Sequence, residues 1–157
     1  MTENTGTQES APRPEFRMQK MYMKDLSFEN PNAPGVYIAQ QQSEPKVELN
    51  LNLNHKKVDD DHYEVTLQIY AKVGSKEEDK SLFILEMEHA AIFLLKNIPE
   101  EHLEMVLGVD CPTLLFPFTR QIVSQVTVDG GFSPFLMEPV NFMALFQNAQ
   151  AKKKAGN

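Results

Sequence analysis

Residues 47–54 of this chain read Val-Glu-Leu-Asn-Leu-Asn-Leu-Asn, and apolar and polar side chains alternate there without a break. Successive side chains of a strand point to opposite faces of a sheet, so this pattern indicates a strand that is buried on one face only. We expect Leu49, Leu51 and Leu53 to face the core and the asparagines to face water. Such a strand is typical of an antiparallel sheet with one solvated face.

Three further segments predict strands in the same sheet. Alternation also runs through 16–29, where one face would hold Phe16, Met18, Lys20, Tyr22, Lys24, Leu26 and Phe28. The same period continues over 63–73, and a long strand follows over 81–95 after a charged turn at 74–80. Beyond His89 this last strand is apolar on both sides, so we expect its later half to be covered on both faces.

The pattern then changes from strand to helix. Asp110 is a favourable N-cap, Pro112 suits the first helical position, and the glycine pair 130–131 suits a helix stop. Pro117 lies inside this helix and is expected to kink it, because proline lacks the donor N–H. A second helix is expected from Pro139. Its apolar stripe consists of Val140, Phe142, Leu145, Phe146 and Ala149.

Strands followed by helices, without βαβ alternation, are typical of an α+β fold in which an antiparallel sheet carries its helices on one face. We expect a single domain over 16–150. The polar residues 1–15 predict a disordered N-terminal tail. Residues 151–157 predict a basic C-terminal tail, in which the lysines 152–154 complement the dipole of the second helix.

The chain of 157 residues is acidic, with a formal net charge of −7. Binding of a polyanion needs clustered Lys and Arg, so nucleic acid is not an expected partner. Cys111 is the only cysteine, which excludes an intramolecular disulfide and favours a reducing compartment. No apolar run has the length of a signal peptide or membrane span, so we expect a cytoplasmic protein without direct membrane insertion.

Side chains suited to catalysis are sparse, and two proline-punctuated apolar blocks, 111–118 and 139–146, dominate the sequence. The histidines fall on different predicted elements, at His55, His62, His89 and His102. Their spacing fits no metal site, and Cys111 without a basic partner is typical of a packing residue. We therefore expect no enzyme activity, no metal and no cofactor, and instead a binding protein.

Three spaced blocks carry a family resemblance. They are 24–34 (KDLSFENPNAP), the run from Leu107-Gly108 through Phe118, and 139–146 (PVNFMALF). In this order they resemble the bacterial protein-export chaperones of the SecB family. The resemblance implies four antiparallel strands plus helices, assembled as a homotetrameric dimer of dimers. It also implies an ATP-independent cytosolic holdase that binds unfolded precursor proteins, keeps them translocation-competent and delivers them to the SecA translocation motor.

Two candidate sites follow from this resemblance. The residues matching the family's SecA-docking surface are Asp25, Glu29, Ile84 and Glu86. On composition alone such carboxylates would be a solvated sheet face, whereas the family implies charge-assisted contacts with a basic, zinc-binding segment of SecA. Candidate residues for a client-peptide groove are Val36, Tyr37, Phe142, Leu145 and Phe146, although core packing also explains the last three. SecB proteins often carry a Trp after the crossover loop, where this chain has 40–43 (QQQS).

Other functions remain open from the sequence. One is a purely structural oligomeric binding protein or adaptor, whose apolar faces serve self-assembly and whose intact oligomer would bind little hydrophobic dye. Another is an enzyme or small-ligand binder with a pocket beneath the crossover loop. A third is a SecB-like chaperone for a non-export client such as an antitoxin.

Overall fold

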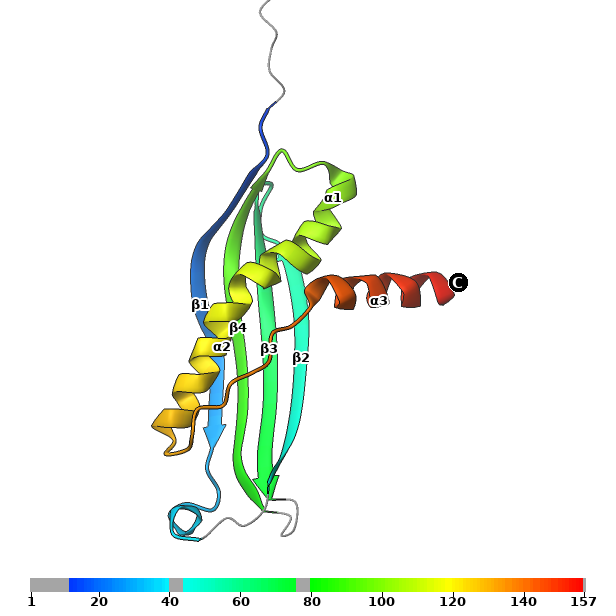
Figure 1. Ribbon diagram of the computed structural model, residues 1–157. Coiled ribbons are helices and arrows are strands. Elements are labelled where there is room, and N and C mark those ends of the chain that lie inside the picture. Colours follow the sequence, from blue (N-terminus) through cyan, green and yellow to red (C-terminus); the bar gives the residue numbers. More distant parts are fainter. Residues whose placement is uncertain (1–11, 40–43, 76–79, 157) are drawn as a thin grey trace, which may run out of the picture.

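Four long strands form one antiparallel sheet in the order β1-β4-β3-β2 (Figure 1). The strands are β1 (Glu15–Glu29), β2 (Pro45–Lys57), β3 (His62–Ser75) and β4 (Ser81–Lys96). The computed structural model describes residues 12–39, 44–75 and 80–156, so most of the predicted N-terminal tail, residues 40–43 and part of the predicted turn at 74–80 lie outside it. All four predicted strands are confirmed to within a few residues.

The two faces of the sheet differ in their cover. Helices pack on one face, here called the helix face, and within the described ranges no second layer covers the other face, here called the open face (Figure 1). Leu51 and Leu53 of β2 are half-buried and the asparagines of that strand are exposed, as predicted. Leu49 is 41% exposed, because the longest helix lies mainly over β3 and β4 and leaves the edge strand β2 partly uncovered.

Strand β1 contains two irregularities that its sequence pattern does not reveal. Its register against β4 shifts at Gln19 and again at Lys24, where one extra residue forms a β-bulge. Each bulge moves the following side chains to the other face, because the side-chain period of a strand is two. The predicted unbroken alternation is therefore wrong in the middle of β1, where Met21 and Met23 lie on the helix face and Tyr22 lies on the open face.

Three helical segments follow the sheet without interruption. They are α1 (Glu100–Met105), the π-helical η2 (Val106–Asp110) and α2 (Cys111–Asp129). The predicted N-cap at Asp110 is wrong: this residue has helical dihedral angles of −68° and −45°, and its side chain caps no N–H, because the chain is already helical before it. Gly130 follows the last residue of α2, as predicted, and Pro117 lies inside the helix. The kink at Pro117 stays a prediction.

The second predicted helix, α3 (Phe142–Ala155), begins three residues after Pro139. Its N-cap is Asn141, whose side chain accepts a hydrogen bond from the Ala144 N–H at 3.0 Å. Pro139 lies instead in the irregular segment that crosses the helix face from α2 to α3 (Figure 1). The lysines 152–154 form part of the last turn of α3, where they complement the helix dipole as predicted.

The core lies between α2 and the central strands β3 and β4. Its fully buried side chains include Val65, Leu67, Leu85, Phe93, Leu115 and Val123. On the open face of β4 beyond His89, Ala90 is buried but Ile92 and Leu94 are half-buried. The predicted cover on both faces is therefore confirmed only in part, because none of the helices that the structure describes packs on that side.

Candidate binding surfaces

Acidic side chains gather on the open face where β1 meets β4. In the register of these strands, Asp25 lies opposite Glu88 and Glu29 lies opposite Ile84, with Glu86 on the same face between them. Asp25, Glu29 and Glu86 are exposed and Ile84 is half-buried. The structure thus brings together all four residues that the sequence singled out, and we call Asp25, Glu29, Ile84 and Glu86 the acidic patch.

The carboxylates of the acidic patch are not held in ion pairs within the part of the chain that the structure describes. Among the residues that the structure describes, Asp25, Glu29 and Glu86 form no salt bridge. The adjacent Glu88 accepts a hydrogen bond from the Gln68 amide at 2.7 Å. A surface of one charge sign attracts partners of the opposite sign and speeds their encounter. The patch, with the aliphatic Ile84 inside it, is suited to a basic segment that also carries an apolar side chain.

A second polar group on the open face ties three strands together. Glu64 of β3 accepts hydrogen bonds from the Tyr22 hydroxyl and from the Lys24 ammonium of β1, the latter at 3.1 Å, and it pairs with Lys56 of β2 at 3.8 Å. Strand β4 lies between β1 and β3, so these contacts pass over it beside the small side chain of Ala90. The sequence did not reveal this group, because the bulge at Lys24 decides which face that side chain takes.

Protonation states within this group follow from its geometry. The hydrogen bond from Tyr22, together with the two lysines, holds the pKa of Glu64 below its usual value although burial opposes the shift. Burial and the Glu64 carboxylate raise the pKa of Tyr22 to about 12. At neutral pH the carboxylate is therefore ionised and the phenol keeps its donor proton. The group fixes β1 against the sheet directly beside Asp25.

The crossover loop, residues 30–39, leaves β1 and includes the short 3-10 turn η1 (Gly35–Tyr37). Its Tyr37 hydroxyl donates a hydrogen bond to the Gly130 carbonyl at 2.6 Å, and the Asn30 amide donates to the same oxygen at 3.3 Å. These bonds satisfy a carbonyl that the end of α2 leaves without a helical partner. They also fasten the loop to the C-terminal end of α2.

Five aromatic rings gather beneath this loop. The centroid of Phe83 lies 5.2 Å from that of Phe132, 5.6 Å from Phe28 and 6.3 Å from Phe135, and Tyr37 lies 5.7 Å from Phe132. Rings at these separations attract one another beyond the effect of burial alone. We call Phe28, Tyr37, Phe83, Phe132 and Phe135 the aromatic cluster. Of these five residues, the sequence indicated only Tyr37 as a candidate. The two phenylalanines that flank Ser133-Pro134 just after α2 could also have indicated an aromatic surface, because two large rings stand close together in a loop segment.

The residues predicted to form a client groove do not lie together. Val36 and Tyr37 lie in the crossover loop, whereas Phe142, Leu145 and Phe146 lie on α3, which docks on η2 in another part of the molecule (Figure 1). Phe142 is buried with its ring centroid 5.9 Å from that of Phe116, and Phe146 packs over Gly108. Phe142 is therefore a core residue, and only the two loop residues adjoin the aromatic cluster.

Replacement of Gly130 by alanine is expected to loosen the crossover loop. The backbone of Gly130, with φ of −75°, tolerates alanine, but a Cβ there would overlap the Phe28 ring. Forcing a methyl group into a packed site costs about 1–3 kcal/mol, so the free energy of unfolding in urea should fall by that amount. Gly35→Ala is the matched control, because a Cβ at Gly35 would meet nothing within 4 Å. Equal unfolding free energies for the two variants would contradict the packing argument.

Comparison with known proteins places the chain in a family. Residues 8–153 match the family described as preprotein translocase subunit SecB. The chain belongs to the SecB family. It is 71% identical over 147 residues to the protein-export protein SecB of Desulfotalea psychrophila, covering 94% of each chain. It is 48% identical over 145 residues to that of Magnetococcus marinus, covering 92% of this chain and 90% of the relative.

A solved structure shares the fold of this SecB-family chain. It is a SecB-like chaperone of Mycobacterium tuberculosis, solved in complex with a peptide from an antitoxin. The TM-score is 0.64 with 14% sequence identity, and the match covers 80% of this chain and 90% of the other. The α+β class, with a four-stranded antiparallel sheet and helices on one face, is thus confirmed by both the architecture and this likeness.

Family membership confirms the expectation that the chain is a chaperone and not an enzyme. Cys111 is buried, and this burial, followed by the charge of Asp110, raises the pKa of its thiol well above the ordinary value. The thiol therefore stays protonated and packs as an apolar side chain. Within the described ranges, no helix is long and apolar enough to span a bilayer.

Proposed function

We propose that this SecB-family chain is an ATP-independent holdase of the cytoplasm, which captures unfolded precursor proteins, keeps them translocation-competent and delivers them to SecA. The observation that carries the proposal is apolar surface beside the aromatic cluster. Ile38, which follows Tyr37, is 83% exposed, and Leu136, which follows Phe135, is 60% exposed. Both side chains directly follow members of the aromatic cluster along the chain, and exposed apolar surface beside such a cluster favours a binding site for apolar segments.

Capture at this surface needs no chemical step. Burial of apolar area contributes about 25 cal/mol per Å², and ordering of the unfolded client offsets part of it. The site recognises apolar character and not a sequence, because flexible and aromatic side chains adapt to unrelated segments. Binding of the unfolded state pulls the client's folding equilibrium toward that state by mass action. A captured precursor is thus kept from folding while it remains bound.

Delivery of the client to SecA would use a different surface. The acidic patch lies on the open face, whereas the aromatic cluster and Leu136 adjoin α2 and the segment after it on the helix side. A basic segment of SecA would meet the carboxylates of Asp25, Glu29 and Glu86 through charge-assisted contacts. Since the two surfaces are separate, the chaperone can bind its client and the motor at the same time.

We also propose that the chain assembles into a homotetramer, arranged as a dimer of dimers. Several copies of the client surface in one assembly raise avidity, because a second segment of the same client binds from an effective concentration that reaches about millimolar. Each contact can then be weak, and the client can leave segment by segment when the motor pulls on it.

A second candidate client is an antitoxin. The related SecB-like chaperone of Mycobacterium tuberculosis was solved with an antitoxin peptide, which favours the view that this fold accepts segments other than export precursors. The high identity to protein-export relatives favours precursors as the main clients of this chain.

Light scattering coupled to size exclusion tests the proposal. The protein is measured alone and after dilution of a denatured precursor into it, with the folded precursor as control. We expect the mass of a tetramer that gains one unfolded chain and does not bind the folded one. An oligomer that binds neither form would favour a purely structural protein and remove the client surface proposed above.

A further inference from the structure

Charges of opposite sign meet on the open face at the second bulge of β1. Lys24, the extra residue of that bulge, has no partner on β4, and Asp25 immediately after it lies opposite Glu88. A cation and the first carboxylate of the acidic patch are thus neighbours on one strand. Among the residues that the structure describes, Lys24 nevertheless forms its salt bridge with Glu64 and forms none with Asp25 or Glu88.

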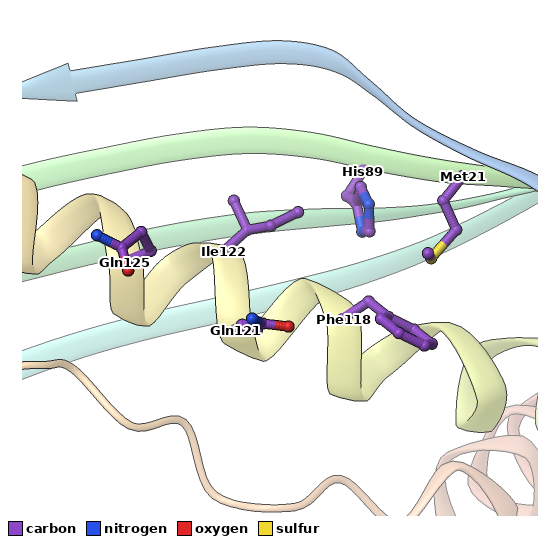
Figure 2. Close-up of a pocket in the computed structure, with 6 residues that line it drawn as sticks. All are labelled: Met21, His89, Phe118, Gln121, Ile122 and Gln125. Atoms are coloured by element: carbon purple, nitrogen blue, oxygen red, sulfur yellow. The ribbon is translucent and has the colours of Figure 1, made fainter.

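The bulge decides which side chains of β1 reach the open face. Met21 of β1 and His89 of β4 point toward α2 and line an open groove on the helix face (Figure 2). Tyr22 lies on the other face, and the extra residue at Lys24 brings the residue after it, Asp25, to that face as well. The open face therefore receives a lysine and an aspartate in succession.

The carboxylate of Glu64 on β3 is arranged to hold a cation. Glu64 is 8% exposed, and the Tyr22 hydroxyl donates to its Oε2. The other oxygen, Oε1, accepts hydrogen bonds from the Lys24 ammonium at 3.1 Å and from the Thr66 hydroxyl at 3.5 Å. The Lys56 ammonium lies 3.8 Å from the same oxygen. Since both oxygens have partners, the carboxylate is fixed in orientation, with Oε1 directed at the two lysines.

The position of Glu64 draws Lys24 away from the acidic patch. Glu64 lies opposite Ile92 of β4, on the far side of the bulge from Glu88. The side chains of Lys24 and Glu64 are 35% and 11% exposed, and a partly buried pair is screened less than an exposed one. The hydrogen bond from Tyr22 holds the pKa of Glu64 below its usual value, although burial opposes the shift, so the carboxylate is ionised at neutral pH.

Loss of this carboxylate would leave a free ammonium beside the acidic patch. A lysine carries its charge on a flexible four-carbon stem, and opposite charges on adjacent strands pair across a sheet. The carboxylates of Asp25 and Glu88 adjoin Lys24 in the register of β1 and β4. The released ammonium would therefore neutralise part of the negative charge that attracts a basic partner.

We propose that Glu64 is a positioning residue for the docking of SecA: its carboxylate holds the Lys24 ammonium away from Asp25 and Glu88 and so keeps the acidic patch fully charged. Glu64 acts through Lys24 and needs no contact with SecA. The inference rests on the proposed delivery to SecA and adds the group that maintains the docking surface.

Calorimetric titration with purified SecA tests the proposal. Glu64→Gln keeps an acceptor for Tyr22 but no charge for Lys24. It should weaken SecA binding about fivefold, the effect of one cation placed about 4 Å from a carboxylate in water. Glu64→Gln with Lys24→Met removes that cation and should restore the wild-type affinity. Raising the salt from about 0.05 M to about 0.5 M should narrow the difference between Glu64→Gln and the wild type, because the free charge is then screened.

The matched control removes the other lysine that the same carboxylate binds. Lys56 lies on β2, which β3 separates from the two strands of the acidic patch. Glu64→Gln with Lys56→Met has the same net charge as Glu64→Gln with Lys24→Met but leaves Lys24 free, so its SecA binding should stay weak. Equal affinities of the two double variants, or wild-type affinity of Glu64→Gln, would overturn the proposal.

A crystal structure of Glu64→Gln provides a test that does not involve SecA. The Lys24 ammonium should lie within about 4 Å of the Asp25 or Glu88 carboxylate, the usual limit for an ion pair. An ammonium that stays beside Tyr22 would overturn the proposal. A wild type that does not bind SecA would overturn the proposed delivery, and the position of Lys24 in the variant would still decide the present inference.

Discussion

Asp25→Lys combined with Glu86→Lys is expected to weaken the binding of SecA at least about 100-fold while client capture stays unchanged. Both carboxylates lie exposed on the open face, and neither forms a salt bridge within the described residues, so lysine is accommodated without loss of a native contact. Each substitution removes a charge-assisted contact and adds repulsion against a basic segment. Calorimetric titration with purified SecA and capture of a denatured precursor measure the two functions separately.

The matched control reverses the charge of two carboxylates that lie outside the acidic patch. Glu100→Lys with Glu101→Lys makes the same change of net charge on two exposed residues in the first turn of α1, away from the sheet. This variant should bind SecA nearly as well as the wild type at physiological salt, where charges separated by more than about 8 Å are screened. Loss of client capture together with SecA binding in a folded Asp25/Glu86 variant would contradict the separation of the two surfaces.

Ile38→Asp combined with Leu136→Asp is expected to weaken capture of a denatured precursor about 100-fold or more. Burial of an aliphatic side chain of this size contributes about 1.5–3 kcal/mol, and the two contributions together correspond to that factor. Because the two side chains are 83% and 60% exposed, the free energy of unfolding should change little. Competition for a fluorescent unfolded peptide measures the affinity, and urea unfolding measures the stability.

The same apolar-to-acidic change at two other exposed positions provides the control. Val58 and Met105 are 54% and 40% exposed but lie in the turn after β2 and in α1, away from the aromatic cluster. Val58→Asp with Met105→Asp should capture the precursor like the wild type. Equal losses in both double variants would mean that client binding follows overall charge and not a defined surface.

The predicted strands match the structure because a strand can be predicted from the pattern of its own residues. Alternation over 47–54 and 63–73 reports which side of each strand meets the core, and this needs no knowledge of the neighbours. The bulges at Gln19 and Lys24 are different, because an extra residue is defined only against the partner strand β4. The start of the long helix was misplaced for a related reason: Asp110 has the composition of a cap, but the helical chain before it removes the need for one.

The candidate sites divide in the same way, into features that a local pattern predicts and features that depend on contacts between distant segments. Asp25 and Glu29 are four residues apart on one strand, so their common face was predictable once the strand was, and the register of β4 brings Ile84 and Glu86 beside them. The aromatic cluster joins side chains from β1, the crossover loop, β4 and the segment after α2. No local pattern connects positions so far apart along the chain, and the predicted groove was therefore assigned partly to α3.

By itself the sequence determined the α+β class, the four strands, the end of the long helix at Gly130 and the common face of Asp25 and Glu29, because each depends on periodicity or on residue type at neighbouring positions. Only the tertiary structure decided which rings meet beneath the crossover loop, that Phe142 is buried, and that the buried His89 ring lies beside the Thr119 hydroxyl. These features arise when layers pack and distant segments meet. Their physical cause lies in contacts between elements, which local patterning does not record.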